Sequence, residues 1–268
     1  MKKTALISMM ICSAVMLTTA CGNVHVVNGI TGKNLKGNGV LIEKERGKMD
    51  FRAINSSGSV DVIIADVADA PVKVSGDENL IDSIETYVKD GILNVHFKKG
   101  FNYSTERGLK VIVPNNGQIN KITASGSSDV NIEGCVIAKD IYISGRGSSD
   151  VKGNIKAENC ELNFKGSSDY KGNIETVTCK VDCSGSSDCI ISGSADVCDI
   201  SMSGSSDFKG FDFVVNRFSC STSGSSDVQV TCNGELNVRA SGSSDVYYKG
   251  DAKIISQHLS GSSDLKRR

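Results

Sequence analysis

Tryptophan is absent from this chain of 268 residues, proline occurs twice, and aromatic residues make up 5% of the sequence. This composition fits a core of small and β-branched side chains better than one built from large rings. The formal net charge is −1 with 23% charged residues, so the sequence indicates neither a nucleic-acid-binding patch nor a disordered chain. No Cys-x-x-Cys pair occurs, which argues against a zinc site.

What the sequence does contain is one four-residue motif, Gly-Ser-Ser-Asp, in eight copies. The copies are Gly126–Asp129, Gly147–Asp150, Gly166–Asp169, Gly185–Asp188, Gly204–Asp207, Gly224–Asp227, Gly242–Asp245 and Gly261–Asp264. Successive glycines are 21, 19, 19, 19, 20, 18 and 19 residues apart. A nearly constant period predicts stacked supersecondary units that share one continuous core.

The residues around the motif alternate between apolar and polar when each glycine is counted as position 0. Positions −6, −4, −2 and +4 are mostly apolar, and this period of two predicts strands with one buried face. Position −6, for example, holds Ile141, Cys160, Cys179, Cys198, Phe218, Leu236 and Ile255, and the pattern breaks at position −4 of the last copy with Gln257.

The same parity places the glycine and the second serine of each copy inward. It places the first serine and the aspartate outward, together with the lysines at position +5, which are Lys152, Lys171, Lys209 and Lys266. A repeat of this length is too short for a four-stranded propeller blade. It predicts an all-β fold, a right-handed parallel β-helix with one repeat per turn. Turns about 4.8 Å apart would give a rod on the order of 34 Å long.

Residues 1–20 have the features of an export signal, with Lys2 and Lys3 before an apolar stretch. Cys21 follows Thr19-Ala20, which predicts a lipoprotein signal with Cys21 as the lipidated residue. Thr18 stands where a lipobox usually has leucine, and an ordinary cleaved signal is the alternative. No later apolar run is long enough to span a bilayer. Residues 21–39 are rich in Gly, Asn, Lys and Val and are expected to form a tether.

Residues 40–121 are expected to be strand-rich but less regular than the repeat region, 122–268. Ile54–Val62 is interpreted as a degraded ninth copy, with Gly58 at position 0 and Asp61 at position +3. The remaining expectations for this part are a short helical turn at Asn79–Ser83, a hairpin at Val88–Leu93, a polar loop at Lys98–Arg107 and a strand at Gly108–Pro114.

Several stretches, in their order along the chain, resemble the head GIN domain family, which is described as auto-transporter adhesins and is common in lipoproteins of Bacteroides-like bacteria. They are Gly37-Asn38-Gly39, Ile54–Val62, Gly76–Ile81, Ile84–Leu93 and the later Ser-Gly-Ser-Ser-Asp-Val copies. The resemblance covers roughly residues 37–265. It implies a β-helical, exported domain with an adhesive role, and it brings no catalytic residues to this chain.

The aspartates of the motif are the main candidate functional residues and are expected to line up along one outer edge. They are Asp129, Asp150, Asp169, Asp188, Asp207, Asp227, Asp245 and Asp264. Neighbouring carboxylates about 4.8 Å apart repel by roughly 0.9 kcal/mol in water. The favoured hypothesis is that each Asp binds nearby backbone N–H or Ser groups at a corner. A calcium-binding face and a polar row that binds a glycan are the alternatives; no other metal and no cofactor is expected.

The cysteines are expected to be core thiols rather than disulfides. Cys160, Cys179, Cys183, Cys189, Cys198 and Cys220 have inward parity, and free cysteine packs as a small hydrophobe. Export would permit disulfides, but thiols stacked one turn apart do not readily reach the required dihedral angle.

These observations predict a non-catalytic binding or adhesion domain on a cell-envelope lipoprotein, with a surface glycan or matrix protein as partner and a lipid anchor in the membrane. A self-assembling envelope scaffold, which would make the protein an oligomer, is the second hypothesis. A carbohydrate-active enzyme is the third, although uniform rows of residues replace the odd clustered residues that such an enzyme needs. His258 lies among many serines and aspartates, but serine is too frequent for this coincidence to indicate catalysis.

Overall fold

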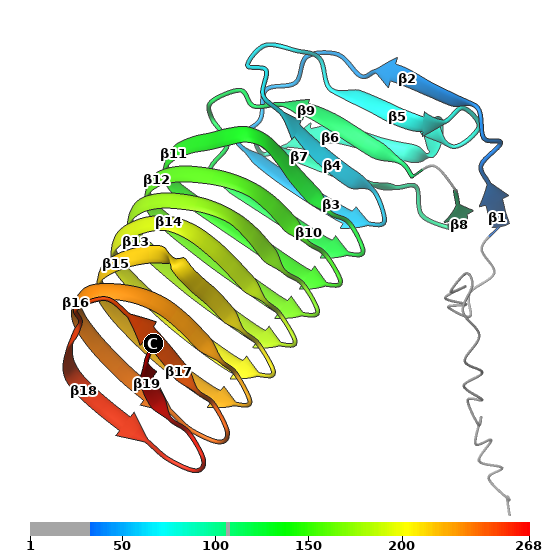
Figure 1. The fold of residues 1–268 in the computed structure, drawn as a ribbon. Coiled ribbons are helices and arrows are strands. Elements are labelled where there is room, and N and C mark those ends of the chain that lie inside the picture. The colour runs from blue at the N-terminus through cyan, green and yellow to red at the C-terminus, as the bar shows by residue number, and fades with distance from the viewer. Residues whose placement is uncertain (1–32, 106–107) are drawn as a thin grey trace, which may run out of the picture. The chain divides into compact units, whose positions relative to one another are not determined.

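The structure, a computed structural model, describes residues 33–105 and 108–268 (Figure 1). These residues form the predicted all-β parallel β-helix, a solenoid of about eight turns with a spacing near 19 residues. The predicted signal, Cys21 and residues 22–32 of the predicted tether lie outside the described residues. No helix among the described residues is long and apolar enough to cross a membrane.

Six long strands, each bent around the core, make most of the solenoid (Figure 1). They are β11 (Val130–Gly147), β12 (Val151–Gly166), β13 (Tyr170–Gly185), β14 (Cys189–Gly204), β15 (Phe208–Gly224) and β16 (Val228–Ala240). Each begins directly after a motif aspartate, and the first five end on the glycine of the next copy. The motif is therefore the corner that interrupts the strand once per turn.

The last turn consists of shorter strands, β17 (Val246–Lys249), β18 (Lys253–Leu259) and β19 (Leu265–Arg267). Neighbouring turns pair in parallel, and Gly166, Gly185 and Gly204 lie directly beside one another in register. Register shifts interrupt the pairing of β11 with β12, β14 with β15, β15 with β16 and β16 with β18. The equal spacing of 19 residues between these three glycines permits this register, because each side chain then packs on its counterpart in the next turn.

The core consists of the inward positions that the alternation predicted. Buried side chains include Ile122, Ile143, Leu162 and Val181 at position −4 and Val130, Val151, Tyr170, Cys189, Phe208, Val228 and Val246 at position +4. The inward prediction is wrong for Ile255, which is 50% exposed. The pairing of β16 with β18 shifts register after Leu236, and this irregularity turns Ile255 outward.

The degraded copy at Ile54–Val62 is the first turn of the solenoid, as predicted. Strands β3 (Ala53–Gly58) and β4 (Asp61–Ala65) pair in parallel with β10 (Lys121–Gly126) and with β11. Gly58 is in register with Gly126 although the intervening chain is much longer than one repeat. The insertion between them folds back on the first turn.

This insertion and the preceding strands form what we call the N-terminal cap, made of β1, β2 and β5–β9. The strands are β1 (Lys33–Lys36), β2 (Leu41–Glu45), β5 (Lys73–Asp77), β6 (Ile84–Lys89), β7 (Ile92–Phe97), β8 (Phe101–Ser104) and β9 (Lys110–Pro114). In the cap β7 and β9 pair in parallel with β3 and β4, whereas β6 and β5 add antiparallel strands and β2 pairs with β5.

Two local predictions for the cap are confirmed. The hairpin joins β6 to β7 through Asp90 and Gly91, whose φ angles of 54° and 74° are those of a tight turn. The helical turn is a 3-10 helix, η1 (Ile81–Ser83).

The strand predicted at Gly108–Pro114 is also confirmed, as β9, whereas the polar loop and the tether are corrected because each contains a strand. The segment expected to be a polar loop contains β8, which pairs in parallel with β1 at the end of the predicted tether. The physical reason is aromatic packing, because the Tyr103 ring stacks on Phe97 with centroids 4.1 Å apart. Leu35 of β1 also packs against the core.

Candidate functional site

The repeated corner begins at a glycine whose backbone no other residue tolerates well. Gly185 has a φ of +93°, and a Cβ there would lie 2.6 Å from the carbonyl oxygen of Gly166 in the preceding turn. The glycines were expected to face inward, but they are exposed. The positive φ at the corner reverses the direction of the chain, so strand parity does not extend to position 0.

The aspartate side chains lie along one edge, and each is bonded to the next turn. In every pair of neighbouring corners the backbone N–H of the later Asp donates to Oδ1 of the earlier Asp. The distances from the donor N to Oδ1 range from 2.8 Å, at Asp188, to 3.3 Å, at Asp207. The donors are Asp150, Asp169, Asp188, Asp207, Asp227, Asp245 and Asp264. Asp129 donates in the same way to Asp61 of the first turn, at 3.1 Å.

The second serines form a buried ladder that runs in the opposite direction. Here, in five of the seven pairs of neighbouring copies, the backbone N–H of the earlier serine donates to Oγ of the later one, as from Ser187 to Ser206 at 3.2 Å and from Ser206 to Ser226 at 3.2 Å. These serines are buried, so an unpaired N–H there would cost free energy. The two ladders together pair backbone groups at the corner that regular strand pairing does not reach.

The first serines form an exposed column beside the aspartates. The column consists of the exposed residues Ser127, Ser148, Ser167, Ser186, Ser205, Ser225, Ser243 and Ser262. Ser59, which is also exposed, extends the column into the first turn. Their backbone N–H groups donate to the glycine carbonyl of the preceding turn, for example from Ser186 to Gly166 at 2.7 Å. The backbone is thereby fixed while the hydroxyl groups point away from the core.

Lysines at position +5 offset part of the negative charge of the aspartates. Lys209 Nζ lies 2.6 Å from Asp188 and 3.4 Å from Asp207, and Lys266 lies 2.8 Å from Asp264. The hydrogen bond with Asp188 raises the pKa of Lys209. Burial raises the pKa of Asp169, and the neighbouring carboxylates Asp150 and Asp188 raise it further. The hydrogen bond from the Asp188 N–H acts in the opposite direction and lowers this pKa.

The described residues contain no cluster of three or more His, Cys, Asp or Glu side chains that is arranged to hold a metal ion. Within the column, Oδ1 of each aspartate from Asp129 to Asp245 already accepts a backbone N–H. These N–H bonds fit the backbone-bonding hypothesis for the aspartates, and calcium binding stays a hypothesis to be tested.

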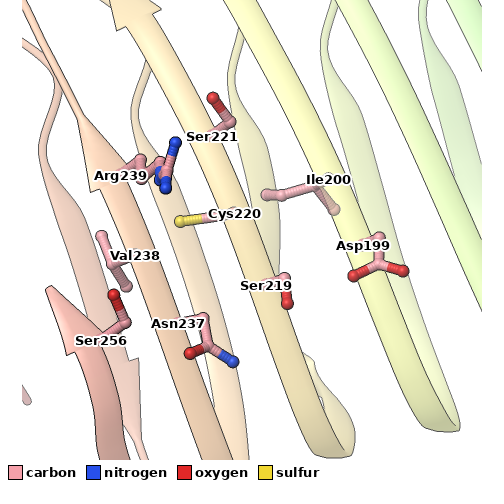
Figure 2. Close-up of a pocket in the computed structure, with 9 residues that line it drawn as sticks. All are labelled: Asp199, Ile200, Ser219, Cys220, Ser221, Asn237, Val238, Arg239 and Ser256. Carbon is pink, nitrogen blue, oxygen red and sulfur yellow. The ribbon is translucent and has the colours of Figure 1, made fainter. Parts of the chain in front are cut away.

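A shallow, open depression lies on the outer face of the strands, away from the corner (Figure 2). Its volume is about 340 Å³, and its polar lining comes from Asp199, Ser219, Ser221, Asn237, Arg239 and Ser256. Figure 2 shows that these residues come from neighbouring turns. Its lining has no aromatic ring, so it lacks the stacking platform on which sugars often bind.

The grouping around His258 does not form a catalytic triad among the described residues. Its Nδ1 lies 3.2 Å from the Ser256 hydroxyl, and no described carboxylate is hydrogen-bonded to the ring. The motif carboxylates lie along an open edge and not in a cleft, which is not the setting of paired carboxylates in glycoside hydrolysis.

The inward cysteines are buried as predicted, and the eight described cysteines are free thiols. Cys160, Cys179 and Cys198 are stacked in register on neighbouring strands. Burial raises the pKa of the Cys220 thiol to about 12. The contacts of these thiols are in the core and not at the exposed edge.

Sequence reasoning missed a second organising residue, Asp77 of the cap. This buried side chain accepts the Gly39 N–H at 2.7 Å through Oδ1 and the Thr105 hydroxyl through Oδ2. Asn79 adds hydrogen bonds with the Asn38 N–H and the Lys36 carbonyl. The segments Gly37-Asn38-Gly39 and Gly76–Ile81, noted above for their resemblance, are thus in direct contact.

Fold and corner together define a β-solenoid with a repetitive polar edge. A family model described as "Putative auto-transporter adhesin, head GIN domain" matches residues 50–252. The chain therefore belongs to the head GIN domain family, as the resemblance indicated. The family description as an adhesin is that of an exported, surface or envelope protein rather than of an enzyme.

Solved structures share this fold. A "putative adhesin" from Parabacteroides merdae has a TM-score of 0.81 at 20% identity, covering 88% of this chain and 100% of that one. A "putative adhesin" from Parabacteroides distasonis has a TM-score of 0.81 at 23% identity, with the same coverage. A "putative lipid binding protein" from Parabacteroides distasonis has a TM-score of 0.77 at 23% identity, again with that coverage. A comparison with curated proteins finds no match.

Proposed function

We propose that this protein is a cell-envelope lipoprotein whose solenoid is a non-catalytic binding or adhesion domain. The observation that supports the proposal most is the column of exposed serine hydroxyls beside a row of aspartates, both repeated once per turn, with lysines next to the aspartates in four of the eight motif copies. A surface of this kind offers the same group about every 4.8 Å. It suits an extended partner with repeating polar groups, either a surface glycan or a matrix protein.

The hydrogen bonds at the corner support this proposal because they leave the column rigid. The backbone on both sides of each exposed serine is bonded to neighbouring turns. A partner would then bind without ordering the loop, which lowers the entropic cost of association. Many weak contacts at a fixed spacing also reinforce each other through multivalency.

The lipoprotein part of the proposal depends on the sequence of the N-terminal segment. Cys21 follows the features of an export signal, and lipid on its thiol would attach the protein to the envelope. Replacing Cys21 with serine is expected to release the protein from the membrane fraction, as measured by fractionation and immunoblotting. Retention of the Cys21→Ser protein in the membrane fraction would contradict the lipid anchor.

The binding test uses glycan and matrix-protein arrays probed with the mature chain. The variant Ser186→Gln/Ser205→Gln is expected to lose binding, because it enlarges two adjacent members of the column. The matched control is Ser194→Gln/Val214→Gln, which changes two exposed residues that are neighbours on β14 and β15 away from the corner. Equal binding by both variants would exclude the column as the binding surface.

The same sample distinguishes the alternatives. Filaments in electron micrographs of the mature chain would support the scaffold hypothesis. Turnover of a bound polysaccharide would support an enzyme. Binding of lipid, the property in the name of one Parabacteroides distasonis neighbour, is less favoured, because two depressions in the described residues are open and partly polar.

A further inference from the structure

Positions −2 and +4 are in contact in the core, across the corner, in the third and fourth copies of the motif. In the third copy these positions hold Phe164 and Tyr170, whose ring centroids are 6.0 Å apart. In the fourth copy they hold Cys183 and Cys189, whose Sγ atoms are 2.9 Å apart. Both cysteines are buried and are free thiols in the structure. The fold therefore brings two thiols together at one corner.

The other buried thiols are arranged differently. Cys160, Cys179 and Cys198 occupy the same position on neighbouring parallel strands, and Cys160 pairs with Cys179 and Cys179 with Cys198. Their Cα–Cβ bonds point in the same direction and not toward one another, which is unfavourable for the dihedral angle of a disulfide. Cys232 has its Sγ contacts with backbone carbonyls, of Asn216 and Glu235.

We propose that Cys183 and Cys189 form a disulfide that closes the corner at Gly185–Asp188, and that the stacked cysteines stay reduced. The two thiols together lose two protons and two electrons as one S–S bond forms. The electrons reduce a disulfide oxidant, such as oxidised glutathione or a thiol oxidoreductase, to two thiols through a mixed disulfide. The loop closed by the bond contains the whole Gly-Ser-Ser-Asp motif of the turn.

Burial determines when this bond can form. A thiolate must attack the oxidant, and burial raises the pKa of Cys189 well above its ordinary value. The exchange therefore takes place before the core closes around the fourth corner. Once formed, the bond is shielded from reductants, because Cys183 and Cys189 are only 2% and 0% exposed.

The test uses a protease that cleaves before aspartate, because one such site lies between the two cysteines. Cleavage before Asp182, Asp188 and Asp196 separates 182–187, which contains Cys183, from 188–195, which contains Cys189. Full-length protein from acid-quenched cells is denatured in the presence of an alkylating agent, so that buried free thiols are blocked before digestion. Mass spectrometry is expected to show these two fragments joined without reductant and separate after reduction.

The stacked cysteines provide the internal control. Fragments with Cys160, Cys179 and Cys198 are expected to be alkylated and unlinked in the same digest. Cys183→Ser should leave Cys189 alkylated without creating a new link. Alkylated Cys183 and Cys189, or a link from either of them to Cys160 or Cys179, would overturn the proposal.

The oxidising location on which this inference relies belongs to the proposed function, and a refolding experiment separates the two. Reduced, unfolded full-length chain is refolded with oxidised glutathione or with reductant alone. A link that forms with oxidised glutathione but is absent from cellular protein would support the pairing and contradict the exported location. A link absent from both samples would overturn the pairing itself.

Discussion

The repeated turns and the N-terminal cap pair their backbone groups in different ways. In the turns, one motif does this at the corners, with the same aspartate bond at every corner and the same serine bond at most of them. In the cap, individual side chains such as Asp77 and Asn79 bond to segments far away in the sequence. The turns therefore depend on a shared geometry, whereas the cap depends on single residues that have no substitute.

The largest difference between the two regions is expected for glycine. Gly185→Ala should lower the free energy of unfolding by about 2–5 kcal/mol, from the positive φ and the clash with Gly166. Gly39→Ala in the cap, at a φ of +77° with nothing within 4 Å of the added Cβ, should cost about 1–2 kcal/mol. Urea unfolding measures both. Equal costs would mean that the close approach of the turns does not select glycine.

The cap should be most sensitive at Asp77. Asp77→Ala leaves the Gly39 N–H without its acceptor and should cost about 1–3 kcal/mol. Hydrogen exchange is expected to speed up in residues 37–40 and to stay unchanged in the repeated turns. Asp82→Ala is the control, since that exposed residue has surface ion pairs with Lys44 and Arg46. Uniformly faster exchange over the whole chain would show that the cap and the turns unfold together.

A single corner aspartate should matter less than Asp77. Asp188→Ala removes the acceptor of the Asp207 N–H and the partner of Lys209, at an expected cost of about 0.5–2 kcal/mol. Asp188→Asn keeps an oxygen acceptor and should recover much of this loss. Chemical denaturation provides the comparison, with Ser186→Ala as the control at the exposed column. A similar loss for Asp188→Ala and Ser186→Ala would contradict the ladder.

Calcium should leave the melting temperature of the unmodified protein unchanged. The reason is that Oδ1 of each aspartate from Asp129 to Asp245 already accepts a backbone N–H. Scanning calorimetry with and without the ion tests this. A rise of more than a few degrees, lost in a variant with several Asp→Asn changes, would instead indicate a cation-binding face by linkage.

The smallest effect is expected for the charge of Asp169. Because burial raises its pKa, the folded state binds the proton more tightly than the unfolded state, so this residue's contribution favours folding more as pH falls through the raised pKa. Asp169→Asn should remove that slope and gain less than about 0.5 kcal/mol at neutral pH, given solvent screening. The pH dependence of urea midpoints measures the slope.

Asp196 offers a comparison of opposite sign. Hydrogen bonds from Asn216 and Arg217 lower its pKa, so its stabilising contribution should be lost as pH falls through the lowered value. Asp169→Asn and Asp196→Asn should therefore change the pH dependence of the urea midpoint in opposite directions. Changes in the same direction would contradict the assignment of burial as the main influence on the pKa of Asp169.

Much of the repeat region could be predicted from the sequence because its signal recurs in every turn. The alternation of apolar and polar residues predicted the buried face, which includes Ile143 and Leu162. The period of the motif predicted that such residues pair in parallel with their counterparts in the next turn. Parity also gave the outward aspartates and buried second serines. It failed at the glycines, whose positive φ reverses the chain, and at Ile255, where a register shift occurs. The direction of the two ladders is a matter of backbone geometry that a one-dimensional pattern does not contain.

The cap could be predicted only in its local parts. The Asp90-Gly91 hairpin has its own sequence signal. The pairing of β7 with β3 and of β9 with β4 joins distant segments through backbone atoms, which leave no side-chain pattern. Asp77 was visible as part of Gly76–Ile81, but nothing in that segment indicates that Gly39 and Thr105 are its partners.

The opposite directions of the serine and aspartate ladders have an evolutionary consequence. An interior turn such as the one at Gly204 meets its neighbours on both sides with the same donors and acceptors. An in-frame duplication or deletion of one repeat unit would therefore join surfaces that already match. The length of the rod can change in single genetic events without any new interface, so related genes are free to differ in turn number while keeping the same end structure.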